Sequence, residues 1–126
     1  MKFRITFNST KNNLPGISFG QENDYWHLNE LNSCDTEYIV NEVLLNLEKI
    51  WNGEKYWDPF RSPTYGAFDT YEFGYDATLI DFGKEKSVVS YGFGDGNFEA
   101  PSEDIYQLMQ EWGKYLRKWK FNIETT

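Results

Sequence analysis

The sequence predicts a single α+β domain in which an antiparallel sheet of about four or five strands packs with two main helices. Three observations predict this fold class. A length of 126 residues suits one domain. Helical periodicity is found in two segments, 36–51 and 102–119, and strand-like alternation is concentrated between them. Segregated helices and strands are typical of α+β domains rather than of doubly wound sheets.

The N-terminal segment is predicted to contribute one or two strands. Residues 2–8 alternate phenylalanine and isoleucine with polar side chains, which predicts a half-buried strand and a possible fourth strand of the sheet. Residues 11–23 contain a Pro-Gly pair and a further glycine, so we expect a loop there. Residues 24–31 alternate imperfectly and could form a second strand.

The first helix is predicted over residues 36–51, where apolar side chains recur at intervals of three and four. Asp35 or Ser33 can cap its start, because a short polar side chain accepts hydrogen bonds from the first helical N–H groups. Asn52-Gly53 is expected to end it, with the glycine in a left-handed conformation.

A loop and a three-stranded meander follow. Residues 54–64 contain two prolines and are predicted to form a loop. Strand-like alternation covers 67–73, 77–82 and 87–93, and residues 83–86 are a hairpin connection between the last two.

The second helix carries the most regular apolar stripe. Residues 94–97, Gly-Asp-Gly-Asn, are predicted to form a turn. Pro101 suits a helix start, where its missing N–H is harmless. Acidic residues follow it and basic residues gather near the far end of segment 102–119, which matches the helix dipole.

Charge excludes some classes of partner. The net charge is −8, with acidic groups concentrated in residues 54–104. Nucleic-acid binding and attachment to anionic membranes both rely on lysine and arginine, so we expect neither. One cysteine cannot form an internal disulfide, and the N-terminus lacks a signal-like apolar run. We therefore expect a cytoplasmic protein that is a monomer or a weak dimer.

No motif predicts catalytic residues, a metal site or a cofactor. His27 and Cys34 are the only residues of their types, too few for the usual zinc site. Residues 92–96, Gly-Phe-Gly-Asp-Gly, lack the lysine of a phosphate-binding loop and are read as a turn. A small hydrolase with paired carboxylates is an alternative, for which the candidates are Asp58, Asp69, Glu72 and Asp76.

Rings and carboxylates are mixed in the centre of the chain, and two interpretations compete. In one, the rings are core and the carboxylates only aid solubility; its core residues are Trp57, Phe60, Phe68 and Phe73. In the other, this is a docking surface for a basic protein, because tyrosine and tryptophan dominate binding hot spots and carboxylates steer basic partners. The second interpretation predicts that Trp57, Tyr65 or Tyr75 stays partly exposed beside the acids.

The C-terminal half favours the docking interpretation. Its layout, "YEFGYDATLIDFG" and "SVVSYGF" followed by "FEAPSEDIYQLMQEWGKYLRKW", resembles small immunity proteins of bacterial polymorphic toxin and contact-dependent growth inhibition systems. The resemblance covers roughly residues 65–119. It implies a cytoplasmic protein that binds one cognate toxin domain, often a nuclease, and blocks it.

Candidate contact residues follow from composition and position. The expected acids that steer or block the basic toxin domain are Glu54, Asp58, Asp69, Glu72, Asp76, Asp95 and Glu99. The expected aromatic anchors are Trp57, Tyr65 and Tyr75. A structural or assembly subunit is a further alternative, which would expose a large apolar patch and self-associate.

Overall fold

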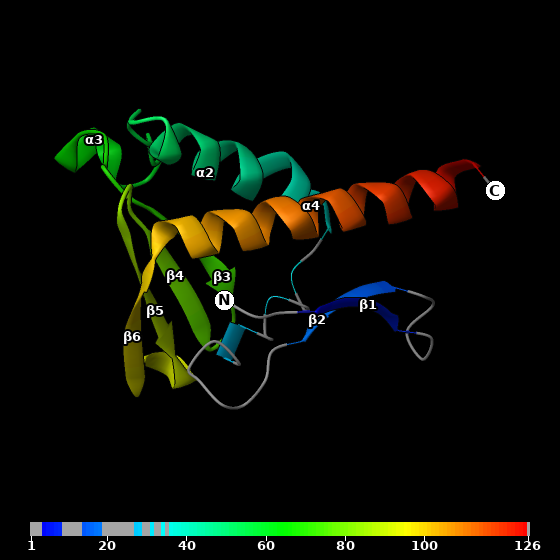
Figure 1. The fold of residues 1–126 in the computed structure, drawn as a ribbon. Coiled ribbons are helices and arrows are strands. Elements are labelled where there is room, and N and C mark those ends of the chain that lie inside the picture. Colours follow the sequence, from blue (N-terminus) through cyan, green and yellow to red (C-terminus); the bar gives the residue numbers. More distant parts are fainter. Residues whose placement is uncertain are drawn as a thin grey trace.

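A four-stranded antiparallel sheet and the helices packed on one of its faces form the body of the protein (Figure 1). The computed structural model describes residues 4–8, 14–18, 27–28, 31, 34 and 36–125. In chain order the elements are β1 (Arg4–Asn8), β2 (Leu14–Ser18), α1 (Thr36–Tyr38), η3 (Ile39–Val43), α2 (Leu44–Trp51), α3 (Ser62–Tyr65), β3 (Tyr71–Tyr75), β4 (Thr78–Phe82), β5 (Lys86–Tyr91), η4 (Gly92–Gly94), β6 (Gly96–Pro101) and α4 (Ser102–Thr125).

The sheet is a meander with the strand order β3-β4-β5-β6. Every neighbouring pair is antiparallel, as the sequence predicted for the first three of these strands. Alternate side chains point to opposite faces of a strand. On the inner face Phe73, Ile80, Phe82 and Val89 are buried under the helices, and the side chains between them are mostly exposed.

The first helix runs without a break through α1, η3 and α2, in agreement with the predicted range 36–51. Its middle portion, η3, is a π-helical turn. Gly53 ends the helix with φ of +83°, the left-handed conformation that the sequence predicted. The capping residues expected at its start, Ser33 and Asp35, lie outside the described residues.

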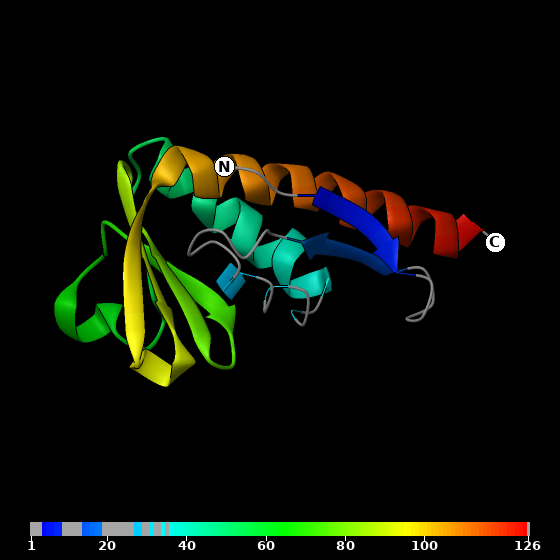
Figure 2. The same cartoon turned by 60° about the horizontal axis from the view of Figure 1, so that its bottom comes forward.

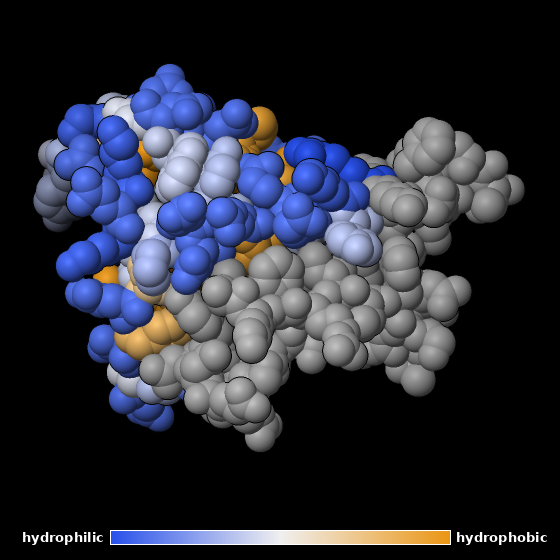
Figure 3. Space-filling model, viewed as in Figure 1, coloured by the Kyte–Doolittle hydropathy of each residue, from blue (hydrophilic) through white to orange (hydrophobic). Residues whose placement is uncertain are grey.

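Helix α4 crosses over the sheet beside α2 (Figures 1 and 2). It begins at Ser102 as predicted and continues to Thr125, past the predicted end at residue 119. Five residues of its apolar stripe are buried: Ile105, Leu108, Met109, Trp112 and Leu116. The surface of the helices that faces the viewer in Figure 3 is largely hydrophilic. A side chain at Gly113 would collide with Leu44 of α2, so the two helices touch at a residue that lacks one.

The N-terminal strand is placed differently from the prediction. Strand β1 pairs with β2 in a separate hairpin that lies beside α4, away from the four-stranded sheet (Figure 2). Residues 14–18 were expected in a loop because of Pro15 and Gly16. A two-stranded hairpin has only edge strands, where proline is tolerated.

The fourth strand of the sheet is β6, in a segment where the sequence predicted a turn and then a helix start. Gly96 and Pro101 are residue types that are rare inside strands, so the sequence did not predict this six-residue edge strand. The possible strand at 24–31 is also wrong where it can be judged, because His27, Leu28 and Leu31 lie in short 3₁₀ turns.

Ser102 fastens the start of α4 to the β4–β5 turn. Its N–H donates to the carbonyl of Glu85 at 2.9 Å, and its hydroxyl donates to the carbonyl of Gly83 at 2.6 Å. The hydroxyl of Ser87 lies 2.7 Å from that of Ser102. Since a hydroxyl has a single proton, Ser87 donates and Ser102 accepts. The helix position is thereby tied to the hairpin.

Candidate functional site

The chain between α2 and β3 forms a closed loop, residues 56–68, which we call the aromatic loop. Tyr56 and Phe68 join its two ends: the N–H of each donates to the carbonyl of the other, both at 2.8 Å. The ring of Tyr56 packs edge-on against Tyr71 of β3, with 4.8 Å between the ring centroids. The base of the loop is therefore fixed to the edge of the sheet.

Asp58 organises the interior of the aromatic loop. Its carboxylate accepts hydrogen bonds from the N–H of Phe60 at 2.8 Å, the N–H of Arg61 at 3.0 Å and the Arg61 Nε at 2.9 Å. The backbone N–H of Asp58 donates to the hydroxyl of Ser62 at 2.8 Å. The bonds from Arg61 and Phe60 favour the ionised carboxylate and lower the pKa of Asp58.

Further contacts limit the freedom of this loop. The guanidinium of Arg61 stacks over the ring of Phe68, 4.6 Å from its centroid. Pro59 and Pro63 fix two φ angles. Gly66, with φ of +81°, turns the chain back after α3. The loop backbone is thus held by contacts within the loop itself.

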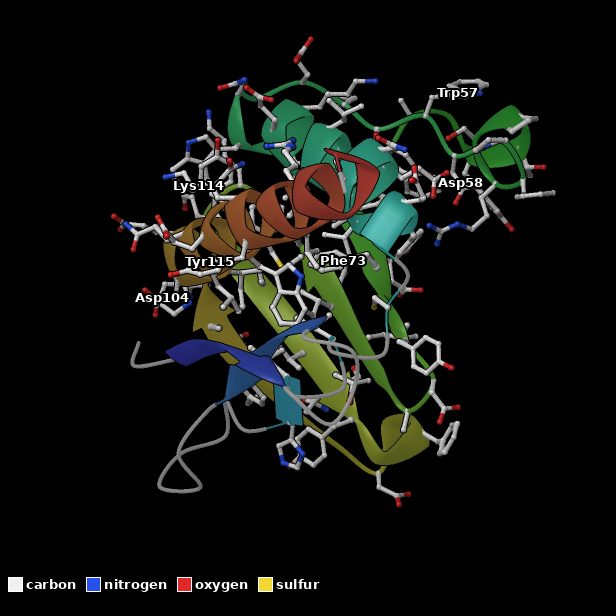
Figure 4. All side chains as sticks on the ribbon, turned by 90° about the vertical axis from the view of Figure 1, so that its right-hand side faces the viewer. Trp57, Asp58, Phe73, Asp104, Lys114 and Tyr115 are labelled. Atoms are coloured by element: carbon white, nitrogen blue, oxygen red, sulfur yellow. The ribbon has the colours of Figure 1, made fainter. Side chains whose placement is uncertain are left out.

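Three large side chains of this braced loop project into solvent. Trp57 is 57% exposed, Phe60 92% and Tyr65 76%. Figure 4 shows Trp57 pointing away from the body of the protein and Phe73 between the strands and the helices. The core interpretation is therefore wrong for Trp57 and Phe60 and correct for Phe73, while Phe68 is half-buried. The predicted exposure of Trp57 and Tyr65 is confirmed.

Two of the predicted acids are already neutralised within the chain. Asp58 forms an ion pair with Arg61 at 2.9 Å, and Asp69 forms one with Lys55 at 2.6 Å. Charge that is compensated this closely attracts a distant partner weakly. The sequence placed these carboxylates near the rings correctly, but it gave no sign that each has its own cation.

Carboxylates without such a cation lie on the outer face of the sheet. Glu72 on β3 is directly opposite Asp81 on β4, and Glu99 on β6 continues the same row beyond Val88. All three acids are exposed, and none forms an ion pair with a described residue. Like charges directly opposite destabilise a sheet. We call Glu72, Asp81 and Glu99 the acidic row.

The acidic row begins close to the aromatic loop. Asp58 raises the pKa of the Arg61 guanidinium, and Glu72 adds to this effect through its charge. The row includes Asp81, which was not among the acids predicted from the sequence to contact a partner. The alternation of residues 77–82 places Asp81 on the outer face of the sheet, and the pairing of β3 with β4 places it opposite Glu72. This alternation and pairing were the signals from which Asp81 could have been predicted.

The remaining predicted residues lie elsewhere. Glu54 is exposed just after α2 and lines a hollow of about 450 Å³ on that helix, together with mainly polar side chains. Tyr75, Asp76 and Asp95 lie at the end of the sheet opposite the aromatic loop, because β3 starts at Tyr71 beside the loop and ends at Tyr75. The ten predicted residues therefore do not form one continuous surface.

Other observations concern metal sites, membranes and relatives. In the described part of the chain, no three His, Cys, Asp or Glu side chains are grouped so that they could hold a metal ion. None of the helices described combines the length and the apolar content that crossing a bilayer requires. Comparison with protein-family models, curated proteins and solved structures finds no match to the chain.

Proposed function

We propose that this protein is an immunity protein that binds and neutralises a cognate toxin domain, a basic nuclease domain in particular. The proposal rests on one observation about the aromatic loop. Hydrogen bonds within the loop fix its backbone, and this backbone keeps the side chains of Trp57, Phe60 and Tyr65 exposed to solvent. In this proposal the protein acts in the cytoplasm, as a monomer or a weak dimer, and catalyses no reaction.

Exposed rings are unfavourable for a free protein and favourable for a complex. Burying a large aromatic side chain stabilises an interface by about 1.5–3 kcal/mol relative to leaving it exposed. A loop that is already ordered loses little conformational entropy on binding, so more of this gain appears as affinity. The contacts made by Asp58 and Arg61 provide that order before any partner arrives.

The acidic row supplies the charge that a basic partner would recognise. Glu72 and Asp81 face each other across two strands at a cost to sheet stability. A partner that brings lysine or arginine to this face removes the repulsion. With a net charge of −8 the whole molecule also attracts a basic domain over distance and raises the rate of encounter. In this proposal the acidic row takes the steering role first given to Asp58 and Asp69.

The test needs a toxin domain as a probe. We would take the basic C-terminal domain of a large secreted protein encoded by the neighbouring reading frame, express it with and without this chain, and measure growth and binding. Single variants Trp57→Ala, Phe60→Ala and Tyr65→Ala are compared with Leu45→Ala, which removes a half-exposed apolar side chain from α2.

We expect the loop variants to fold normally and to weaken binding by more than about tenfold at one or more positions. Leu45→Ala should bind as the wild type does. If the toxin domain is neutralised by all three loop variants equally well, the aromatic loop is not the interface. If no neighbouring toxic domain is neutralised at all, the immunity function itself is refuted.

A further inference from the structure

In the connection between β5 and β6, Phe93 has an unfavourable backbone conformation and an exposed side chain. Phe93 has φ of 56° and ψ of 37°, in the left-handed region that large side chains rarely adopt. Gly92 and Gly94 on either side also have positive φ, 61° and 91°. The ring is 78% exposed, so its burial in this chain does little to offset the strain.

A second turn lies against this connection. The N–H of Phe93 donates to the carbonyl of Ala77 at 3.2 Å, which brings the β5–β6 connection next to the β3–β4 turn. Strand β3 ends before that turn at Tyr75, which is 48% exposed, and β4 follows it with Leu79, which is 40% exposed. The strand register places Tyr75 on the same face as buried Phe73 and Leu79 on the opposite face, so the two exposed apolar side chains flank the tip on different sides.

Two carboxylates belong to the same two turns. Asp76, with φ of 54°, lies between Tyr75 and Ala77, and Asp95 follows Gly94. Both side chains are exposed, and neither forms an ion pair within the described residues. We call Tyr75, Asp76, Phe93 and Asp95 the sheet tip.

We propose that the sheet tip is a second docking surface, separate from the aromatic loop. Its partner is a protein segment that offers an apolar pocket to the Phe93 ring and lysine or arginine side chains to Asp76 and Asp95. The charge of the two carboxylates selects this chemistry, because a basic rim around an apolar pocket complements it. A second copy of this chain, with a net charge of −8, fits less well.

The two surfaces are separated along the sheet. The four-residue advance of β3 from Tyr71, beside the aromatic loop, to Tyr75 corresponds to roughly 13 Å. A partner segment at the tip can therefore bind while the aromatic loop is free. The inference stands on the tip residues alone and does not require the proposed immunity function.

A displayed library of random peptides provides the probe. It is selected on the wild-type protein, and each binder is then measured against Phe93→Gly, Asp76→Asn, Asp95→Asn, Phe60→Ala and Leu45→Ala. Glycine accepts a positive φ at no steric cost, so Phe93→Gly removes the ring and relieves the strain together. Its melting temperature should equal or exceed that of the wild type, which shows that a loss of binding is not unfolding.

The inference predicts binders that combine lysine or arginine with large apolar residues. They should bind Phe93→Gly more than about tenfold more weakly, lose affinity with either asparagine variant and with added salt, and bind Phe60→Ala and Leu45→Ala normally. The inference is overturned if no such binder is selected or if the binders tolerate Phe93→Gly. Concentration-dependent dimerisation that Phe93→Gly abolishes would overturn it in favour of a second copy.

Discussion

At the residue scale, Asp58 has a structural role that the sequence did not predict. It was expected to be an acid that steers or blocks the basic toxin domain. The structure gives its carboxylate three hydrogen bonds, two of them from the backbone N–H groups of Phe60 and Arg61, which directly precede α3. A residue with these contacts acts like a helix cap, so its removal has a structural cost.

We predict that Asp58→Ala lowers the free energy of unfolding by about 0.5–2 kcal/mol, the usual cost of a lost cap. Asp69→Ala is the matched control, because Asp69 forms an exposed ion pair with Lys55 and such pairs contribute about 0–1 kcal/mol. Urea unfolding followed by circular dichroism measures both. Equal losses for the two variants would contradict the capping role.

The lowered pKa of Asp58 gives this prediction a pH dependence. A carboxyl group with a lowered pKa in the folded state contributes stability above its unfolded pKa. That contribution is lost as the pH falls through the folded pKa. The stability difference between the wild type and Asp58→Ala should therefore be constant near neutral pH and shrink in acid, below the usual range for aspartate. A difference that does not change with pH would show that the carboxylate is not the stabilising group.

At the scale of elements, the attachment of α4 to the β4–β5 turn depends on a buried pair of hydroxyls. Ser102 donates to the Gly83 carbonyl and accepts from Ser87, and both serines are buried. The sequence showed Ser102 only as one of several polar residues at a helix start. Its partner in the hairpin became visible only when β5 and β6 were paired.

We predict that Ser102→Ala destabilises the protein more than Ser87→Ala does. The first change leaves both the Ser87 hydroxyl and the Gly83 carbonyl without a partner, and each unsatisfied buried group costs about 1–3 kcal/mol. The second change leaves the bond from Ser102 to Gly83 intact. Thermal unfolding of the two variants tests this order, and a reversed order would show that the donor assignment is wrong.

At the scale of the whole molecule, one core joins the sheet to both helices. Phe73, Ile80 and Val89 come from three strands, and their buried neighbours in the same cluster come from η3, α2 and α4. A shared core predicts one cooperative unfolding transition for the domain, as small single domains usually show.

We predict that Phe73→Ala lowers the free energy of unfolding by about 3–5 kcal/mol, the typical cost of removing a buried ring. Phe60→Ala makes the same chemical change at an exposed position and should alter stability by less than about 0.5 kcal/mol. For each variant, tryptophan fluorescence and far-ultraviolet circular dichroism should give the same midpoint. Separate midpoints would indicate more than one folding unit.

Much of the fold could be predicted because its signals are local. The apolar periodicity of segments 36–51 and 102–119 and the alternation around the 83–86 turn each appear within one element. The predictions were wrong in two segments, 14–18 and 96–101, where the local sequence suggests a turn or a helix start but the segment pairs with a neighbouring strand. Pro15 in β2 and Gly96 in β6 resemble turn residues and Pro101 resembles a helix start, and only the neighbouring strand makes them part of a sheet.

By itself the sequence determined the α+β class, the two helices, the meander and the mixture of rings and acids in the middle of the chain. Only the tertiary structure decided which carboxylates have cations, that Asp81 joins Glu72, and that Tyr75 is at the opposite end of the sheet from Trp57. The physical reason is that charge compensation and shared surfaces depend on contacts between elements. Strand register and loop closure set those contacts, and a single segment does not encode either one.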